Sequence, residues 1–173
     1  MRGQERFIID LKGMKEEKAT FKFDLGNDYF EALEAKDING GTLQALLEVS
    51  KVGEAYLLDF QVGGVVIVPC DICLADMEVE VNTQSKMEVR LGDQYQEDDD
   101  IVTIPEEDGT LDVSWLIYEM TALAVPTRHV HEDGECDPAM LRKLEELSAS
   151  DNEGGGSDPR WRGLEKIKST FKE

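Results

Sequence analysis

The fold is decided by residues 42–68, which read TLQALLEVSKVGEAYLLDFQVGGVVIV. Apolar and polar residues alternate along residues 42–52 and 55–68, and this alternation predicts two half-buried strands. Gly53 and Glu54 join them, and glycine supplies the positive φ of a tight hairpin, so the strands should pair antiparallel. Gly63-Gly64 inside the second strand predicts a β-bulge that bends the sheet.

Further strand patterns lie on both sides of this hairpin. Residues 7–11 (FIIDL) and 19–25 (ATFKFDL) have the alternation and aromatic content of strands and could begin a sheet. Asn27 is the expected N-cap of a short helix that ends near Leu33. After the hairpin, the alternation runs from Met77 to Leu91 around a polar segment at residues 82–85, which predicts another half-buried hairpin.

The helical patterns lie in the second half of the chain. Residues 113–124 (VSWLIYEMTALA), after Asp112 as a cap and before Pro126 as a stop, predict the main core helix. The predicted fold class is α+β: a bent antiparallel β-sheet, with closure into a barrel left open, one main helix and a flexible C-terminal helical arm. The expected organisation is a single domain at residues 1–147, a flexible linker at 148–157 and a basic amphipathic helix at 158–173.

All the cysteines and histidines lie in two short patches. Cys70 and Cys73 form a CxxC pair at the end of a β-rich run, and Cys136 follows His129 and His131 downstream. Three thiolates with one of the two histidines would complete a tetrahedral, structural zinc site. The alternative is that these are ordinary thiols in a turn and exposed histidines in a polar loop. A thioredoxin-like role is disfavoured, because residues after Cys73 read as a strand where that motif needs a helix.

The charge balance restricts the class of partner. The 173 residues include 38 acidic and 18 basic side chains, a net charge of −20, which repels phosphate backbones and attracts basic proteins. Direct binding of naked nucleic acid is therefore not expected. With no apolar run long enough to cross a membrane and no secretory signal pattern, a cytoplasmic protein is expected.

Two segments stand out as candidate partner-binding sites. Residues 93–112 contain many acidic residues and no basic one, and they form either a solvated loop around an edge strand or a landing site for a basic partner. The C-terminal helix would dock on its own domain or engage a partner through its basic and aromatic side chains. The candidate residues in the two segments are Asp98, Asp99, Asp100, Glu106, Glu107, Arg160 and Trp161.

Together these features give a recognisable layout along nearly the whole chain. A β-rich half ends in VPCDICL (residues 68–74), an acidic middle leads through LDV (111–113) into a helix and AVP (124–126), and a His/Cys patch precedes DPRW (158–161). The chain resembles the YceD family of large ribosomal RNA subunit accumulation proteins. One departure is that many relatives carry a second downstream cysteine pair, where this chain has Cys136 alone.

The resemblance implies a non-enzymatic bacterial factor, also found in plastids, that is needed for normal accumulation of 23S ribosomal RNA. Charge and resemblance together favour a basic large-subunit ribosomal protein or a pre-ribosomal particle as the partner. The alternative function is a zinc- or thiol-dependent enzyme, a nuclease or oxidoreductase, centred on Cys70 and Cys73. No hydrolase, phosphate-loop or zinc-protease motif supports that alternative.

Overall fold

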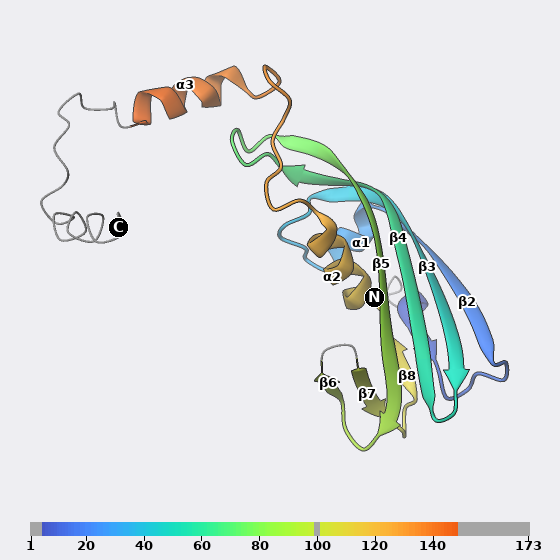
Figure 1. Ribbon diagram of the computed structural model, residues 1–173. Coiled ribbons are helices and arrows are strands. Elements are labelled where there is room, and N and C mark those ends of the chain that lie inside the picture. The colour runs from blue at the N-terminus through green and yellow to red at the C-terminus, as the bar shows by residue number, and fades with distance from the viewer. Residues whose placement is uncertain (1–4, 99–100, 149–173) are drawn as a thin grey trace, which may run out of the picture. The chain divides into compact units, whose positions relative to one another are not determined.

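The computed structural model describes residues 5–98 and 101–148 (Figure 1). The chain divides into two compact units, residues 1–137 and 138–173. The first unit is α+β, and the described part of the second consists of helix α3. The elements of the first unit are a 3-10 turn (Glu5–Phe7), β1 (Ile8–Asp10), β2 (Lys18–Leu25), α1 (Asn27–Ala32), β3 (Gly40–Val52), β4 (Ala55–Pro69), β5 (Asp76–Gly92), β6 (Gln96–Asp98), β7 (Ile101–Pro105), β8 (Thr110–Asp112) and α2 (Ser114–Ala124). Helix α3 spans Pro138–Leu147.

The predicted hairpin at residues 42–68 is confirmed as the centre of the sheet. Strands β3 and β4 pair antiparallel over their whole length, and the turn has Gly53 at φ +64°. The alternation works as expected, because one side chain in two points into the core: Leu47, Val49 and Phe60 are completely buried. Burial of each such side chain contributes roughly 1.5–3 kcal/mol to folding.

The sheet is open and mixed. Its strand order is β2-β3-β4-β5-β7-β6, so β2 and β6 are its edges, and no pairing among the described residues closes it into a barrel. All neighbours are antiparallel except β5 and β7, which are parallel. The two N-terminal strands were expected to begin one sheet, but they belong to different sheets. Strand β1 pairs with β8 in a separate two-stranded sheet, whereas β2 pairs with β3. Strand β7 is not an edge strand, since β6 pairs outside it.

The second predicted hairpin is wrong: residues 76–92 form one strand. Strand β5 pairs with β4 without interruption from Pro69↔Asp76 to Ala55↔Arg90. The polar residues at 82–85 do not turn the chain, because β4 offers main-chain partners along the whole segment. Asn82 and Gln84 are exposed on the outer face, while Thr83 and Ser85 are half-buried on the core face. Gln84, for example, donates a hydrogen bond of 2.8 Å to Asp59 on β4.

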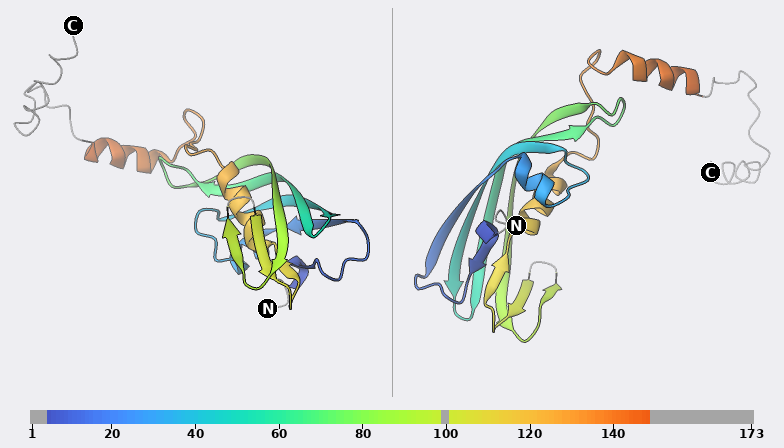
Figure 2. Two further views of the ribbon diagram at one scale, coloured as in Figure 1. Left: turned by 60° about the horizontal axis from the view of Figure 1, so that its bottom comes forward. Right: turned by 180° about the vertical axis from the view of Figure 1, so that it is seen from behind.

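The predicted bulge is also absent. The register runs unbroken through Gln44↔Gly63 and Leu43↔Gly64. Gly64 has φ +145°, and a Cβ there would meet the carbonyl oxygen of Thr42 and lie 2.9 Å from the Cα of Leu43. The glycine therefore permits a close approach of two backbones, and the long strands curve without an extra residue (Figure 2).

The two helices of the first unit lie on the same face of the sheet (Figures 1 and 2). The predicted cap of α1 is wrong, since Gly26 is the N-cap and the Asn27 side chain instead accepts a hydrogen bond from the amide of Gly41. The main helix is confirmed as α2. Val113 occupies its N-cap position, and the carboxylate of Asp112 accepts a hydrogen bond of 2.9 Å from the amide of Ser114.

A buried hydrogen bond joins the two helices. The Tyr29 hydroxyl on α1 donates 2.7 Å to the carbonyl oxygen of Ser114 at the start of α2. Burial, then the nearby Asp112 carboxylate, raises the pKa of Tyr29 well above its usual range, so the donor proton stays in place. In the described part of the chain, no helix is long and apolar enough to span a membrane.

Candidate metal centre

The CxxC pair forms the turn between β4 and β5. The amide of Cys70 donates to the carbonyl of Ala75 at 2.8 Å, and the amide of Leu74 donates to the carbonyl of Cys70 at 2.9 Å. Leu74 adopts φ +61°, which closes the turn, and the amide of Ile72 points at the Cys70 sulfur from 3.4 Å. The sequence thus places both thiols on one knuckle between two strands.

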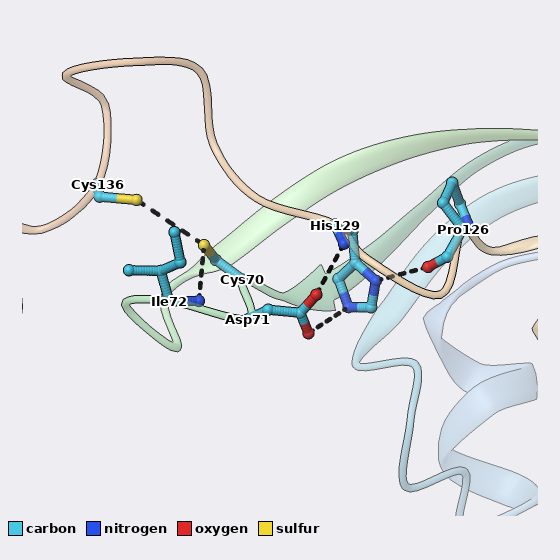
Figure 3. A network of polar contacts seen from close by, with 6 residues as sticks. All are labelled: Cys70, Asp71, Ile72, Pro126, His129 and Cys136. Atoms are coloured by element: carbon cyan, nitrogen blue, oxygen red, sulfur yellow. Dashed lines mark hydrogen bonds and ion pairs between the residues drawn. The ribbon is translucent and has the colours of Figure 1, made fainter. Parts of the chain in front are cut away.

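A clamp brings the segment after α2 to this knuckle (Figure 3). The amide of Asp71 donates to the carbonyl of His129 at 3.0 Å, and the amide of His129 donates to the Asp71 carboxylate at 2.8 Å. The ring of His129 donates from Nδ1 to the carbonyl of Pro126 at 2.9 Å, while its Nε2 lies 3.6 Å from the same carboxylate. His129 is therefore engaged in holding the two segments together.

Four of the five residues predicted as metal ligands come together, and His129 is the one left out. The ligand atoms of Cys70, Cys73, His131 and Cys136 all lie within 4.8 Å of one another. The Sγ atoms of Cys70 and Cys136 are 3.9 Å apart, and His131 Nδ1 lies 3.4 Å from Cys73 Sγ and 3.9 Å from Cys136 Sγ.

The three shorter separations, 3.4–3.9 Å, are close to those of a tetrahedral zinc site. With Zn–S of about 2.3 Å and Zn–N of about 2.0–2.1 Å, ligand atoms at the corners of a tetrahedron lie roughly 3.5–3.8 Å apart. All three cysteines are buried and free of disulfides, and His131 is half-buried. The donor set and its closed arrangement fit a metal ion that has four protein ligands.

The electrostatics of the cluster favour a bound cation. Burial raises the pKa of the Cys70 thiol, but hydrogen bonds from the amides of Cys73, Ile72 and His131 and from the His131 ring outweigh it and lower the pKa to about 5. Burial and the sulfurs of Cys70 and Cys73 raise the pKa of Cys136 to about 11. A Cys70 thiolate thus forms readily. Cys136 stays protonated at neutral pH unless a cation lies among the sulfurs.

Of the predicted partner-binding residues that the structure describes, Asp98 lies opposite the start of β7, and Glu106 and Glu107 follow its end. Asp98 ends strand β6 and is exposed. Glu106 follows β7 and pairs with Lys12, whose Nζ lies 3.6 Å from its carboxylate and donates 2.9 Å to its carbonyl. Glu107 is exposed beside it. Four others, Asp99, Asp100, Arg160 and Trp161, lie outside the described residues.

Asp71 is a functional residue that the sequence reasoning missed. Its carboxylate and amide make both backbone contacts to His129, so it sets the position of the segment that carries His131 and Cys136. The available signal was a carboxylate inside the CxxC turn, next to the first ligand and next to backbone amides that need acceptors.

Comparison with known proteins identifies one family. Residues 58–168 match the model of a family described as large ribosomal RNA subunit accumulation protein YceD. The matched range begins within β4 and contains all four residues of the metal cluster. No curated protein and no solved structure matches the chain significantly.

Proposed function

The chain belongs to the YceD family of large ribosomal RNA subunit accumulation proteins, and on that premise we propose that it supports the accumulation of 23S ribosomal RNA during assembly of the large subunit. The observation that carries this proposal is the family match over residues 58–168. The family description points to a role in ribosomal RNA accumulation and names no reaction, which supports a non-enzymatic role.

The charge of the chain supports an indirect mode of action. At a net charge of −20, contact with bare RNA would bring like charges together, whereas a basic ribosomal protein would be attracted at long range. The proposed partner is therefore a basic large-subunit protein, free or already bound in a pre-ribosomal particle. The chain would protect the RNA by delivering or retaining that protein.

The metal cluster is proposed to hold a structural zinc ion. Cys70, Cys73 and Cys136 would bind as thiolates and His131 through Nδ1, so that zinc neutralises the buried sulfurs and joins the β4–β5 turn to the segment after α2. A catalytic zinc keeps one coordination position for water or substrate, and four protein ligands leave none. This argument favours a structural metal over the zinc-dependent enzyme.

The partner proposal is tested by capture and sedimentation. Tagged full-length protein should recover large-subunit proteins or pre-ribosomal particles from lysate at moderate salt, and should co-sediment with pre-ribosomal fractions. Nuclease treatment of the lysate is the control, because direct capture of a basic protein should survive it. Recovery of bare RNA without any ribosomal protein would contradict the proposal.

The zinc proposal is tested by composition and by substitution. Elemental analysis of the purified protein should find about one zinc per chain. Cys70→Ser should release the metal and lower the stability of the protein. No enzymatic activity should be lost, because a structural metal supports none. A variant that keeps its fold and stability but loses a measurable hydrolytic or redox activity would instead support the enzyme.

A further inference from the structure

Strand β5 has a long unpaired edge. It pairs with β4 from Asp76 to Arg90, but on its other side β7 pairs only with Glu88–Gly92. For residues 76–87, no strand among the residues that the structure describes lies on that side (Figure 1). Every second residue of such a segment directs its N–H and C=O away from the paired strand β4. These groups offer a template for another strand.

The edge is accessible. Of the residues between Asp76 and Met87, only Val81 is buried, and the other side chains are half-buried or exposed. Helix α2 contacts β5 but leaves this segment partly open, since inward-pointing Met77 and Val79 remain half-buried. A covered edge would bury those side chains.

The two long edges of the sheet differ in charge. The outer edge strand β2 carries the exposed lysines Lys18 and Lys22. The open edge of β5 carries exposed Glu78 and Glu80, which form no ion pair within the described residues, and its first basic residue is Lys86. Strand β2 also carries exposed Asp24, but its lysines make the β5 edge the more acidic of the two and the better match for a basic strand.

A stripe of exposed side chains lies on α2, the helix that contacts β5. Trp115, Glu119 and Leu123 are spaced by four residues and share one face; Trp115 is 51% and Leu123 86% exposed. The Trp115 ring donates 2.7 Å from Nε1 to the Glu119 carboxylate. Burial and then the carboxylates of Glu97 and Glu119 raise the pKa of Tyr95, which places Glu119 near the β5–β6 connection. Strands β6 and β7 are on the open side of β5, so Glu119 lies on that side as well.

We propose that the edge of β5 at residues 76–87, together with the Trp115–Leu123 stripe, binds an extended lysine- or arginine-containing segment of a partner protein as an added strand. Main-chain hydrogen bonds would supply affinity, and alternate side chains would supply selectivity. Basic side chains would reach Glu78 and Glu80, and apolar ones would contact the stripe on α2. This inference rests on the proposed function and specifies how the basic partner is held.

A second copy of the chain suits this edge poorly. Pairing two such edges would bring Glu78 and Glu80 of each copy against those of the other, and like charges on adjacent strands are destabilising. The acidic edge thus selects for a basic segment and against self-association.

The probe is a synthetic capped peptide of alternating lysine and valine, about ten residues long to span the open edge. Full-length protein is titrated with it, and binding is followed by amide exchange in NMR. Amides within residues 77–87 should gain protection, while amides of β2 should not. The same peptide N-methylated at alternate residues keeps its charge but cannot extend the ladder, and it should bind at least about tenfold more weakly, a difference of about 1.4 kcal/mol.

A matched pair of variants tests the charge. Glu78→Lys with Glu80→Lys should weaken peptide binding about tenfold, because two attractions become repulsions. The control, Glu48→Lys with Glu54→Lys, changes net charge equally on the central strand β3 and in the β3–β4 turn, and it should weaken binding no more than about twofold. All four side chains are exposed, so the fold should persist.

Several results would overturn the proposal. Equal binding of the N-methylated peptide, equal loss in the two variants, or no binding at all would each do so. Protection of the edge in the free protein would mean that a second copy or residues 149–173 of the same chain occupy it, and sedimentation mass would separate these cases. If the Glu78→Lys, Glu80→Lys protein still captures ribosomal proteins normally, the edge proposal fails alone; if wild type captures none, the proposed function fails.

Discussion

Alanine at Gly64 should destabilise the protein strongly, and alanine at the adjacent Gly63 should not. Gly64 has φ +145°, a conformation that costs a residue with a side chain about 1–3 kcal/mol. Its Cβ would also meet backbone atoms of Thr42 and Leu43, which cannot move aside as a flexible side chain could, and such overpacking costs about 1–3 kcal/mol more. We expect a loss of about 4 kcal/mol, a large part of the roughly 5–15 kcal/mol that stabilises a domain.

Gly63 is the matched control because it lies next to Gly64 in the same strand and is likewise half-buried. Its nearest neighbour to an added Cβ is the carbonyl oxygen of Val81 at 3.9 Å, which is ordinary contact. Gly63→Ala should therefore change stability by no more than about 1 kcal/mol, and a small gain is expected from the reduced freedom of the unfolded chain.

Urea unfolding followed by far-UV circular dichroism measures both variants. With a slope of about 2 kcal/mol per molar urea, Gly64→Ala should lower the midpoint by about 2 M, and Gly63→Ala should raise it by less than about 0.5 M. If the two midpoints fell together, or if Gly64→Ala lost less than about 1 kcal/mol, the close approach of β3 and β4 would not be the reason for this glycine.

Three further predictions concern the helices, the metal and the sheet surface. Tyr29→Phe should lower the free energy of unfolding by about 1–2 kcal/mol in thermal denaturation, because the carbonyl of Ser114 loses its buried donor; an unchanged Tm would contradict this. Removal of zinc with a chelator should lower the free energy of unfolding without unfolding the sheet. The loss should be about 4 kcal/mol if the free zinc concentration had been about 1,000 times its Kd. Cys73→Ser should be as stable as the chelated wild type, and any stabilisation of that variant by zinc would argue against the site. The hydrogen bond from Gln84 and the contact with Lys86 lower the pKa of Asp59, so its contribution of up to about 1 kcal/mol is present at neutral pH and is lost as the pH falls through that lowered pKa. Asp59→Asn should thus be less stable than wild type at neutral pH and equal to it in acid, and a gap that persists in acid would refute the assignment.

The sequence was sufficient to predict the central hairpin and the main helix, because each depends on local patterns. Alternation around Gly53 specifies two strands and a tight turn, and the periodicity of residues 113–124 specifies a helix. The single strand β5 could not be told from a hairpin in this way, since alternation on both sides of Asn82 fits either. The length of β4, which offers a partner for every residue of β5 from Asp76 to Arg90, decides the matter and is a long-range property.

The candidate metal cluster was predictable in its ligand types but not in its choice of histidine. His129 and His131 are both close enough to Cys136 in sequence, and spacing favours neither. The structure separates them through Asp71, whose contacts draw His129 to the β4–β5 turn and leave His131 to face the sulfurs. The sequence also could not predict whether the sheet stays open or closes into a barrel. That depends on whether β2 and β6 meet, and so on a curvature that no short segment encodes.

The clamp between Asp71 and His129 gives the cluster a second attachment that involves no metal. These contacts hold the segments that carry the cysteines and His131 side by side without any metal, so the chain entropy of bringing them together would already be lost before an ion bound. A site preorganised in this way would take up and release an ion with little rearrangement. Exchange of the ion would then proceed as a local event, and the remainder of the sheet would keep its form throughout.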